Sequence, residues 1–120
     1  MTTRVLALAG LVLAFAAPAF AAPASTSSTT LHISAKAAGL AFSTTHLTAP
    51  HGTVTIMMKN LSPLPHDIAI QGNGVNKKGK LVPKGATSIV TATLKKGTYT
   101  FLCTVPGHAA AGMKGKLTVT

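Results

Sequence analysis

The stretch "YTFLCTVPGHAAAGMKGKLTV", residues 99–119, decides the fold. In the segment "TYTFLC" (98–103), Tyr99, Phe101 and Cys103 share one face, because successive side chains of a strand point to opposite sides. The segment "GKLTVT" (115–120) has the pattern of a further strand, and residues between the two are small or loop-forming. The stretch therefore predicts two strands joined by a loop, with an aromatic, buried face on the first strand.

The rest of the chain repeats this strand pattern at short intervals. In "TVTIMMK" (53–59), Val54, Ile56 and Met58 alternate onto one face, and no long stretch of the folded part has the apolar spacing of a helix. The residues 72–85, rich in Gly, Asn and Lys, are expected to form a loop. About seven short strands separated by turn signals predict an all-β sandwich or barrel. The other expected strands are 31–35, an extended piece at 39–50, 66–70 and 86–94.

The loop of the opening stretch carries three residues that can bind a soft metal. Cys103, His108 and Met113 follow the spacing C-x4-H-x4-M, and His66 precedes an apolar run that would begin at the same pole of the sandwich. Taken singly, the cysteine could be a small buried side chain, the histidines loop residues and the methionine core filler. Together, two imidazoles, a thiolate and a weak thioether are the ligand set of a blue-copper site, whereas zinc gains nothing from the methionine.

Both segments that carry these residues resemble the cupredoxins, the small plastocyanin- and azurin-like blue copper proteins. The resemblance covers residues 31–120 and is carried by residues 99–119 and by "NLSPLPHDIAI" (60–70). It implies a Greek-key β-sandwich of about seven to eight strands. It also implies one type 1 copper ion with His66, Cys103 and His108 as equatorial ligands and Met113 as the axial ligand. The chain departs from the family at Asp67, where many members have asparagine. We expect Asp67 to accept backbone N–H bonds from the Cys103–Thr104 region. These hydrogen bonds would tie the segment that carries His66 to the loop that carries Cys103.

The charge of the chain is strongly one-sided. Eleven Lys and Arg face one acid, which gives a formal net charge of +10, and the acid is Asp67. This balance predicts redox partners with acidic docking surfaces. Nucleic acid is not expected as a partner, because the lysines are scattered through loops and no aromatic ladder accompanies them. The remaining histidines, His32, His46 and His51, are expected to be exposed, with a weak surface copper site at His46 and His51 as the alternative.

The N-terminal segment has the pattern of an export signal. Residues 1–21 combine Arg4, an apolar run and the sequence Ala19-Phe20-Ala21, which predicts a secretory signal peptide cleaved after Ala21; an uncleaved membrane anchor is the alternative. Residues 22–30 are expected to form a flexible leader, and residues 31–120 the copper-binding domain. This organisation predicts a periplasmic or otherwise extracytoplasmic monomer with no stable membrane span after cleavage.

Two functions fit this site. The first is a carrier that shuttles one electron through Cu(I)/Cu(II), and the alternative is an extracytoplasmic copper storage or delivery protein. An enzyme is not expected, because one short domain with one mononuclear site lacks the further histidine cluster that copper oxidases and nitrite reductases need.

Overall fold

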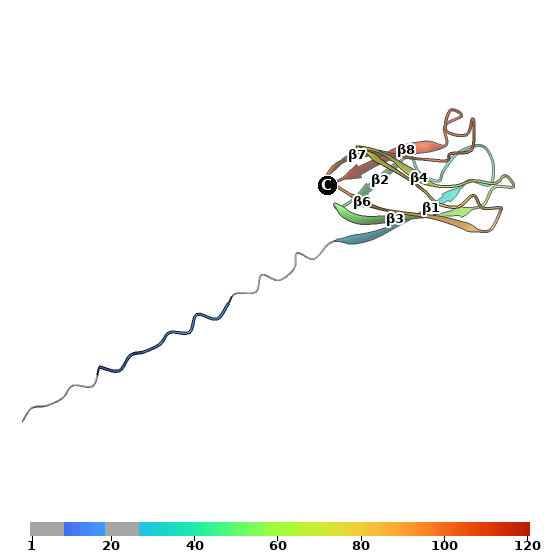
Figure 1. The fold of residues 1–120 in the computed structure, drawn as a ribbon. Helices are drawn as coiled ribbons and strands as arrows, with labels where there is room; N and C mark the ends of the chain where they lie inside the picture. Colours follow the sequence, from blue (N-terminus) through green and yellow to red (C-terminus); the bar gives the residue numbers. More distant parts are fainter. Residues whose placement is uncertain (1–8, 19–26) are drawn as a thin grey trace, which may run out of the picture.

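The computed structural model describes residues 9–18 and 27–120, and within these ranges it contains strands and no helix. Residues 28–120 form a β-sandwich whose loops gather at the end opposite the C-terminus (Figure 1). The strands are β1 (Ser28–Ala35), β2 (His46–Ala49), β3 (Gly52–Asn60), β4 (Ala69–Gly72), β5 (Val75–Lys78), β6 (Thr87–Leu94), β7 (Gly97–Leu102) and β8 (Lys114–Val119).

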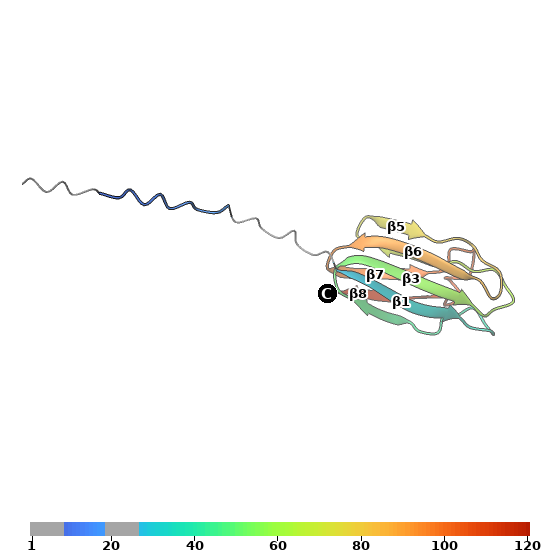
Figure 2. The same cartoon turned by 90° about the horizontal axis from the view of Figure 1, so that it is seen from below.

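Two sheets make up the sandwich. One has the order β1-β3-β6 and the other β2-β8-β7-β4-β5. The pairs β1–β3 and β2–β8 are parallel, and the other neighbouring pairs are antiparallel. Seen from below, β1, β3 and β6 form the near layer, and β5 lies beside β6 where the edges of the two sheets meet (Figure 2). The chain crosses repeatedly between the sheets, and the all-β sandwich predicted from the sequence is confirmed.

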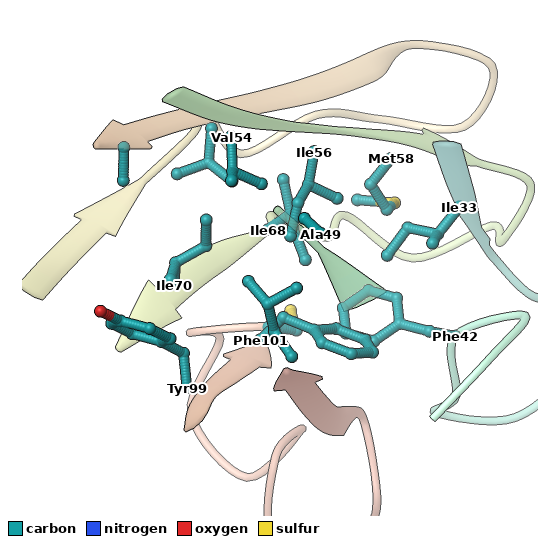
Figure 3. Close-up of a cluster of buried hydrophobic side chains, with 14 of the residues drawn as sticks. Ile33, Phe42, Ala49, Val54, Ile56, Met58, Ile68, Ile70, Tyr99 and Phe101 are labelled. Carbon is teal, nitrogen blue, oxygen red and sulfur yellow. The ribbon is translucent and has the colours of Figure 1, made fainter. Parts of the chain in front are cut away.

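The core lies between the sheets and is built by strand alternation. Val54, Ile56 and Met58 of β3 are fully buried on one face, as their spacing predicts, and point toward the side chains of the second sheet (Figure 3). Phe101 of β7 meets Phe42 there, with ring centroids 5.8 Å apart and a tilt of 44°. Offset aromatic pairs of this kind add to the free energy of apolar burial. The core therefore fixes the two sheets against each other and holds the strand ends in place.

The structure corrects three expectations about the elements. Residues 75–78, expected to be loop, form β5, which pairs with β4 through a two-residue turn at Asn73 and Gly74. Both turn residues have positive φ, 49° and 80°, so the Asn-Gly dipeptide supplies the hairpin turn that matches strand twist. The strand expected at 66–70 begins only at Ala69, and the extended piece at 39–50 contains only the short strand β2.

The N-terminal boundary also differs from the expectation. β1 begins at Ser28, so the last three residues of the expected leader (28–30) belong to this strand and pair with β3. The carbonyl of Ser27 extends this pairing by accepting a hydrogen bond from the N–H of Thr53 at 2.9 Å. Residues 9–18 are exposed and have no regular secondary structure, and no helix of the described residues is long and apolar enough to cross a membrane. The rest of the predicted signal peptide and leader, residues 1–8 and 19–26, lies outside the described residues.

Candidate metal centre

Strand pairing brings three of the predicted ligands to one pole. Cys103 directly follows β7, and the pairing of Leu102 with Ala69 places the start of β4 beside it. His66 lies just before β4, in the connection from β3, and His108 lies in the loop between β7 and β8. The expected meeting of His66 and Cys103, which are 37 positions apart in the chain, is therefore present.

The donor atoms of these three residues converge on one point. The Nδ1 atoms of His66 and His108 lie 3.1 Å apart. The Sγ atom of Cys103 lies 3.8 Å from Nδ1 of His66 and 3.6 Å from Nδ1 of His108. A metal ion bonds imidazole nitrogen at about 2.0–2.1 Å and thiolate sulfur at about 2.3 Å, so donors up to about 4.1–4.4 Å apart can share one ion. All three separations fall within that limit, and the residues present fit a single metal ion.

The three donor residues differ in burial. The side chains of His66 and Cys103 are almost completely buried, whereas His108 is half-buried. Nε2 of His66 is also buried, and it has no hydrogen-bond partner among the described residues. No hydrogen bond of its own thus holds Nε2, while Nδ1 faces the other two donors. Nδ1 is thus the ring nitrogen placed to bind a metal ion, whereas Nε2 lacks the hydrogen bond that metal-binding histidines usually donate from their second nitrogen.

The same burial sets the protonation of the free site. Desolvation, and then the neighbouring His108, lower the pKa of His66, and the charge of Asp67 opposes the shift. Desolvation raises the pKa of the Cys103 thiol, against the backbone N–H groups of Asp67 and Val105. Both residues are therefore favoured in their neutral forms without metal. Because a thiolate is the ligand, binding of a metal must displace the Cys103 proton.

Met113 is held beside both Cys103 and His108. It is completely buried, and its carbonyl accepts a hydrogen bond from the N–H of Cys103 at 3.1 Å. Its own N–H donates to the carbonyl of His108, also at 3.1 Å. Gly107 takes a φ of 82°, a left-handed value that lets the chain turn tightly just before His108. The short loop therefore returns the chain so that all three residues of C-x4-H-x4-M lie together.

Asn60, which the sequence analysis missed, anchors the segment that carries His66. Its side-chain amide donates to the carbonyls of Leu64, at 2.8 Å, and Val82, at 2.9 Å. His66 and Val82 also exchange backbone hydrogen bonds, at 3.1 and 2.9 Å. The signal in the sequence is weak: one asparagine at the end of an apolar strand, before a turn rich in proline. Asn60 is completely buried, and its amide gives the Leu64 carbonyl a donor and the Val82 carbonyl a second donor besides the N–H of His66.

Asp67 makes the contact expected of it. Its Oδ1 accepts a hydrogen bond from the backbone N–H of Thr104 at 2.6 Å, and its Oδ2 accepts one from the Thr104 hydroxyl. The side chain is buried, with 4% of its surface exposed. The acid thus ties the residue after His66 to the residue after Cys103, and it fixes the spacing of the two segments.

The other histidines lie elsewhere. His32, His46 and His51 are exposed. The Nδ1 of His46 lies 3.1 Å from the Thr45 hydroxyl, and that of His51 lies 2.9 Å from the carbonyl of Thr120. Within residues 9–18 and 27–120, the only cluster of three or more His, Cys, Asp or Glu side chains that could hold a metal is His66, Cys103 and His108, whose ligand atoms lie within 4.8 Å of one another. His46 and His51 of the alternative surface site are not part of this cluster.

A two-sheet β-sandwich with a buried cysteine and two histidines converging at one pole defines a cupredoxin, a copper-binding protein. The model of the copper binding proteins, plastocyanin/azurin family, matches residues 13–120, and the chain belongs to this family.

Matches to individual proteins are consistent with membership of this family. The chain is 40% identical over 90 residues to plastocyanin A/B of Petroselinum crispum, covering 68% of this chain and 89% of that one. A match to auracyanin-B of Chloroflexus aurantiacus is 58% identical but spans only 33 residues, 14% of that protein. Among solved structures, a reduced auracyanin from Roseiflexus castenholzii superposes with a TM-score of 0.68 at 30% identity, covering 80% of this chain and 99% of that chain. Auracyanin A of Chloroflexus aurantiacus, described as a blue copper protein, gives a TM-score of 0.67 at 30% identity, covering 78% of this chain and all of that chain.

Proposed function

We propose that this protein is an exported electron carrier in which His66, Cys103, His108 and Met113 hold one copper ion. The observation that carries the proposal is the convergence of two imidazole nitrogens and one sulfur, 3.1 to 3.8 Å apart, in a largely buried site. Bound copper would supply a one-electron Cu(I)/Cu(II) couple. The donor set is soft enough for Cu(I) and contains the imidazoles that Cu(II) favours.

The protein's part in electron transfer is to keep these donors still. Cys103 is fixed by its place after β7 and by the hydrogen bond from its N–H to Met113. His66 is fixed by Val82 and Asn60, and Asp67 joins the two segments. Because packed side chains and satisfied hydrogen bonds hold the site before metal enters, both oxidation states meet nearly the same geometry. A small rearrangement between the states means a low barrier to electron transfer.

His108 is the proposed exit for the electron. It is the one histidine of the cluster that is only half-buried, and exposed Leu64, Pro106 and Gly107 come from the two loops at the same pole. An apolar surface of this kind suits brief contacts with partner proteins. The lysines number 11 − 1 = 10, since Arg4 is the single arginine, and would orient partners whose docking surfaces are acidic.

The test is to add Cu(II) to the purified protein and record visible and EPR spectra, followed by a redox titration. We expect intense thiolate-to-copper charge transfer and a reversible one-electron couple. Cys103→Ser should abolish the colour while the circular dichroism of the β-sandwich remains, and His66→Gln should disturb the spectrum. The matched control His32→Gln, at an exposed histidine outside the cluster, should leave it unchanged.

Two outcomes would contradict the proposal. Binding of Cu(II) without thiolate charge transfer would mean that Cys103 is not a ligand. A copper site that cannot be cycled, but that gives up its ion readily to a competing chelator, would instead support storage or delivery.

A further inference from the structure

A shallow groove lies on the side of the sandwich, where the chain passes from β5 into β6. It is lined by Lys80, Val82, Thr87 and Ile89 and has a volume of about 290 Å³. Ile89 points away from the core and is 48% exposed, and neighbouring Leu81 is 58% exposed. Apolar ligand sites for small molecules usually begin at about 300 Å³. This lateral groove is therefore of a size for one or two side chains of another protein rather than for a large cofactor.

The surroundings of the lateral groove are basic. Lys80 lines it, and β5, the edge strand that lies beside β6 (Figure 2), carries Lys77 and Lys78 on its two opposite faces. The one acidic residue of the chain, Asp67, is buried and occupied by Thr104. No carboxylate side chain is therefore exposed near these lysines to neutralise them. A partner that fills the groove would be attracted most if its own carboxylates surrounded the apolar side chain.

The wall of the lateral groove is connected to the metal centre by hydrogen bonds. Val82 exchanges two backbone hydrogen bonds with His66. The hydroxyl of Ser88 donates to the carbonyl of Lys80 at 2.7 Å and accepts the N–H of Ile68 at 3.3 Å. The segment that lines the groove is thereby fixed to the segment that carries His66, and a partner seated there would lie close to the metal pole.

We propose that the lateral groove is a docking site for a protein partner that presents an apolar side chain flanked by carboxylates. The proposal rests on the proposed electron-carrier function for the nature of the partner, a redox protein, but the binding itself requires only the groove and its lysines. Val82 and Ile89, which line the groove, would contact the apolar side chain, and Lys80 would pair with the acids around it. His108 does not line this groove, so docking there would place the partner at the side of the metal pole.

The experiment is an NMR titration of the ¹⁵N-labelled full-length protein, copper-free and in the Cu(I) form. The probe is a synthetic peptide with one leucine between four aspartates, and the comparison peptide has serine in place of leucine. We expect amide shifts centred on Lys80, Val82 and Ile89, and binding of the serine peptide roughly fivefold or more weaker, because an apolar contact is lost. Ile89→Thr and Lys80→Gln should each weaken binding of the leucine peptide several-fold.

The controls separate this groove from general attraction of charge. Lys96→Gln removes the same charge in the β6–β7 turn, at the end of the sandwich away from the metal pole, and should leave binding almost unchanged. Ile89→Thr replaces one β-branched side chain by another at an exposed strand position, and its amide spectrum shows whether the fold is kept.

Three results would overturn the proposal: equal effects of Lys80→Gln and Lys96→Gln, equal binding of the two peptides, or shifts centred on the loop of His108. Stronger binding to vesicles of anionic lipid than to the leucine peptide would assign the surface to a membrane instead. Because the copper-free protein is also titrated, failure of copper loading would refute the proposed function without deciding the docking site, which the peptide titration decides.

Discussion

Replacement of Asp67 by alanine should destabilise the protein far more than replacement by asparagine. Alanine leaves the N–H of Thr104, which donates to Oδ1 at 2.6 Å, without its acceptor in a largely buried place. Hydrogen bonds to charged groups are worth about 1.5–3 kcal/mol each. The Thr104 hydroxyl is partly exposed and can turn to water, so it contributes less. We expect a loss of about 3 kcal/mol in the free energy of unfolding for Asp67→Ala.

Asparagine should preserve most of this stability. Its side-chain oxygen can accept the N–H of Thr104, and its amide can donate to the Thr104 hydroxyl oxygen. We expect Asp67→Asn to lie within about 1 kcal/mol of the wild type. For a folded part of about 90 residues, 1 kcal/mol shifts Tm by roughly 4–8 °C, so the alanine variant should melt about 12–24 °C lower.

Urea unfolding of the copper-free protein, followed by circular dichroism, measures this difference without interference from the metal. Thr104→Val is the control, because it removes only the hydroxyl and keeps the backbone hydrogen bond, and it should cost less than Asp67→Ala. If the alanine and asparagine variants unfold at the same urea concentration, the bridge between Asp67 and Thr104 does not stabilise the fold and the reasoning fails.

Four further predictions concern the site and the charge. Asp67→Asn should also raise the reduction potential by tens of millivolts, because a carboxylate at an assumed ~8 Å in an effective dielectric of ~20 favours Cu(II) by roughly 2 kcal/mol, or about 90 mV at most; equal potentials in a redox titration would make the charge irrelevant. Met113→Leu should keep the colour and raise the potential, because loss of a weak sulfur donor favours Cu(I); a lower potential would exclude Met113 as the axial ligand. The copper-free protein should lose stability as the pH falls below about 6.5, because the lowered pKa of His66 lets the unfolded chain bind the proton first. Urea midpoints in His66→Gln should then depend less on pH, and an unchanged slope would contradict this. Reduction by ferrocyanide, a small anion, should slow as salt rises, since the net charge is +10, whereas rates independent of salt would argue against electrostatic steering.

Parts of the fold were predictable because they depend on local alternation. Val54, Ile56 and Met58 alternate with polar residues, and such a pattern requires one buried face wherever the strand lies. The strand β5 was missed because three of its four side chains, those of Asn76, Lys77 and Lys78, are polar and exposed, and they show no apolar alternation. The sequence signal for β5 was the dipeptide Asn73–Gly74. A two-residue hairpin turn of this kind needs positive φ at both residues, and asparagine followed by glycine is the favoured pair for it.

The identity of the candidate ligands could likewise be predicted from the sequence, but the distances between them could not. Cys103, His108 and Met113 lie within one loop, and their spacing alone indicates a soft metal site. The distance from this loop to His66 depends on the pairing of β4 with β7, a contact between distant parts of the chain. Asn60 could not be recognised, because an asparagine before a turn is common and only its buried carbonyl partners reveal its role.

By itself, the sequence determined the class of fold, the chemistry of the donor atoms and the sign of the surface charge, since each follows from residue type and local order. The tertiary structure alone decided that His66 Nδ1 lies 3.8 Å from Cys103 Sγ, that Asn60 donates to the carbonyls of Leu64 and Val82, and that Lys80 and Ile89 share one groove. The physical reason is that these relations join residues whose separation in the chain says nothing about their separation in space. Only the packing of one sheet on the other selects one arrangement among the many that the same local patterns allow.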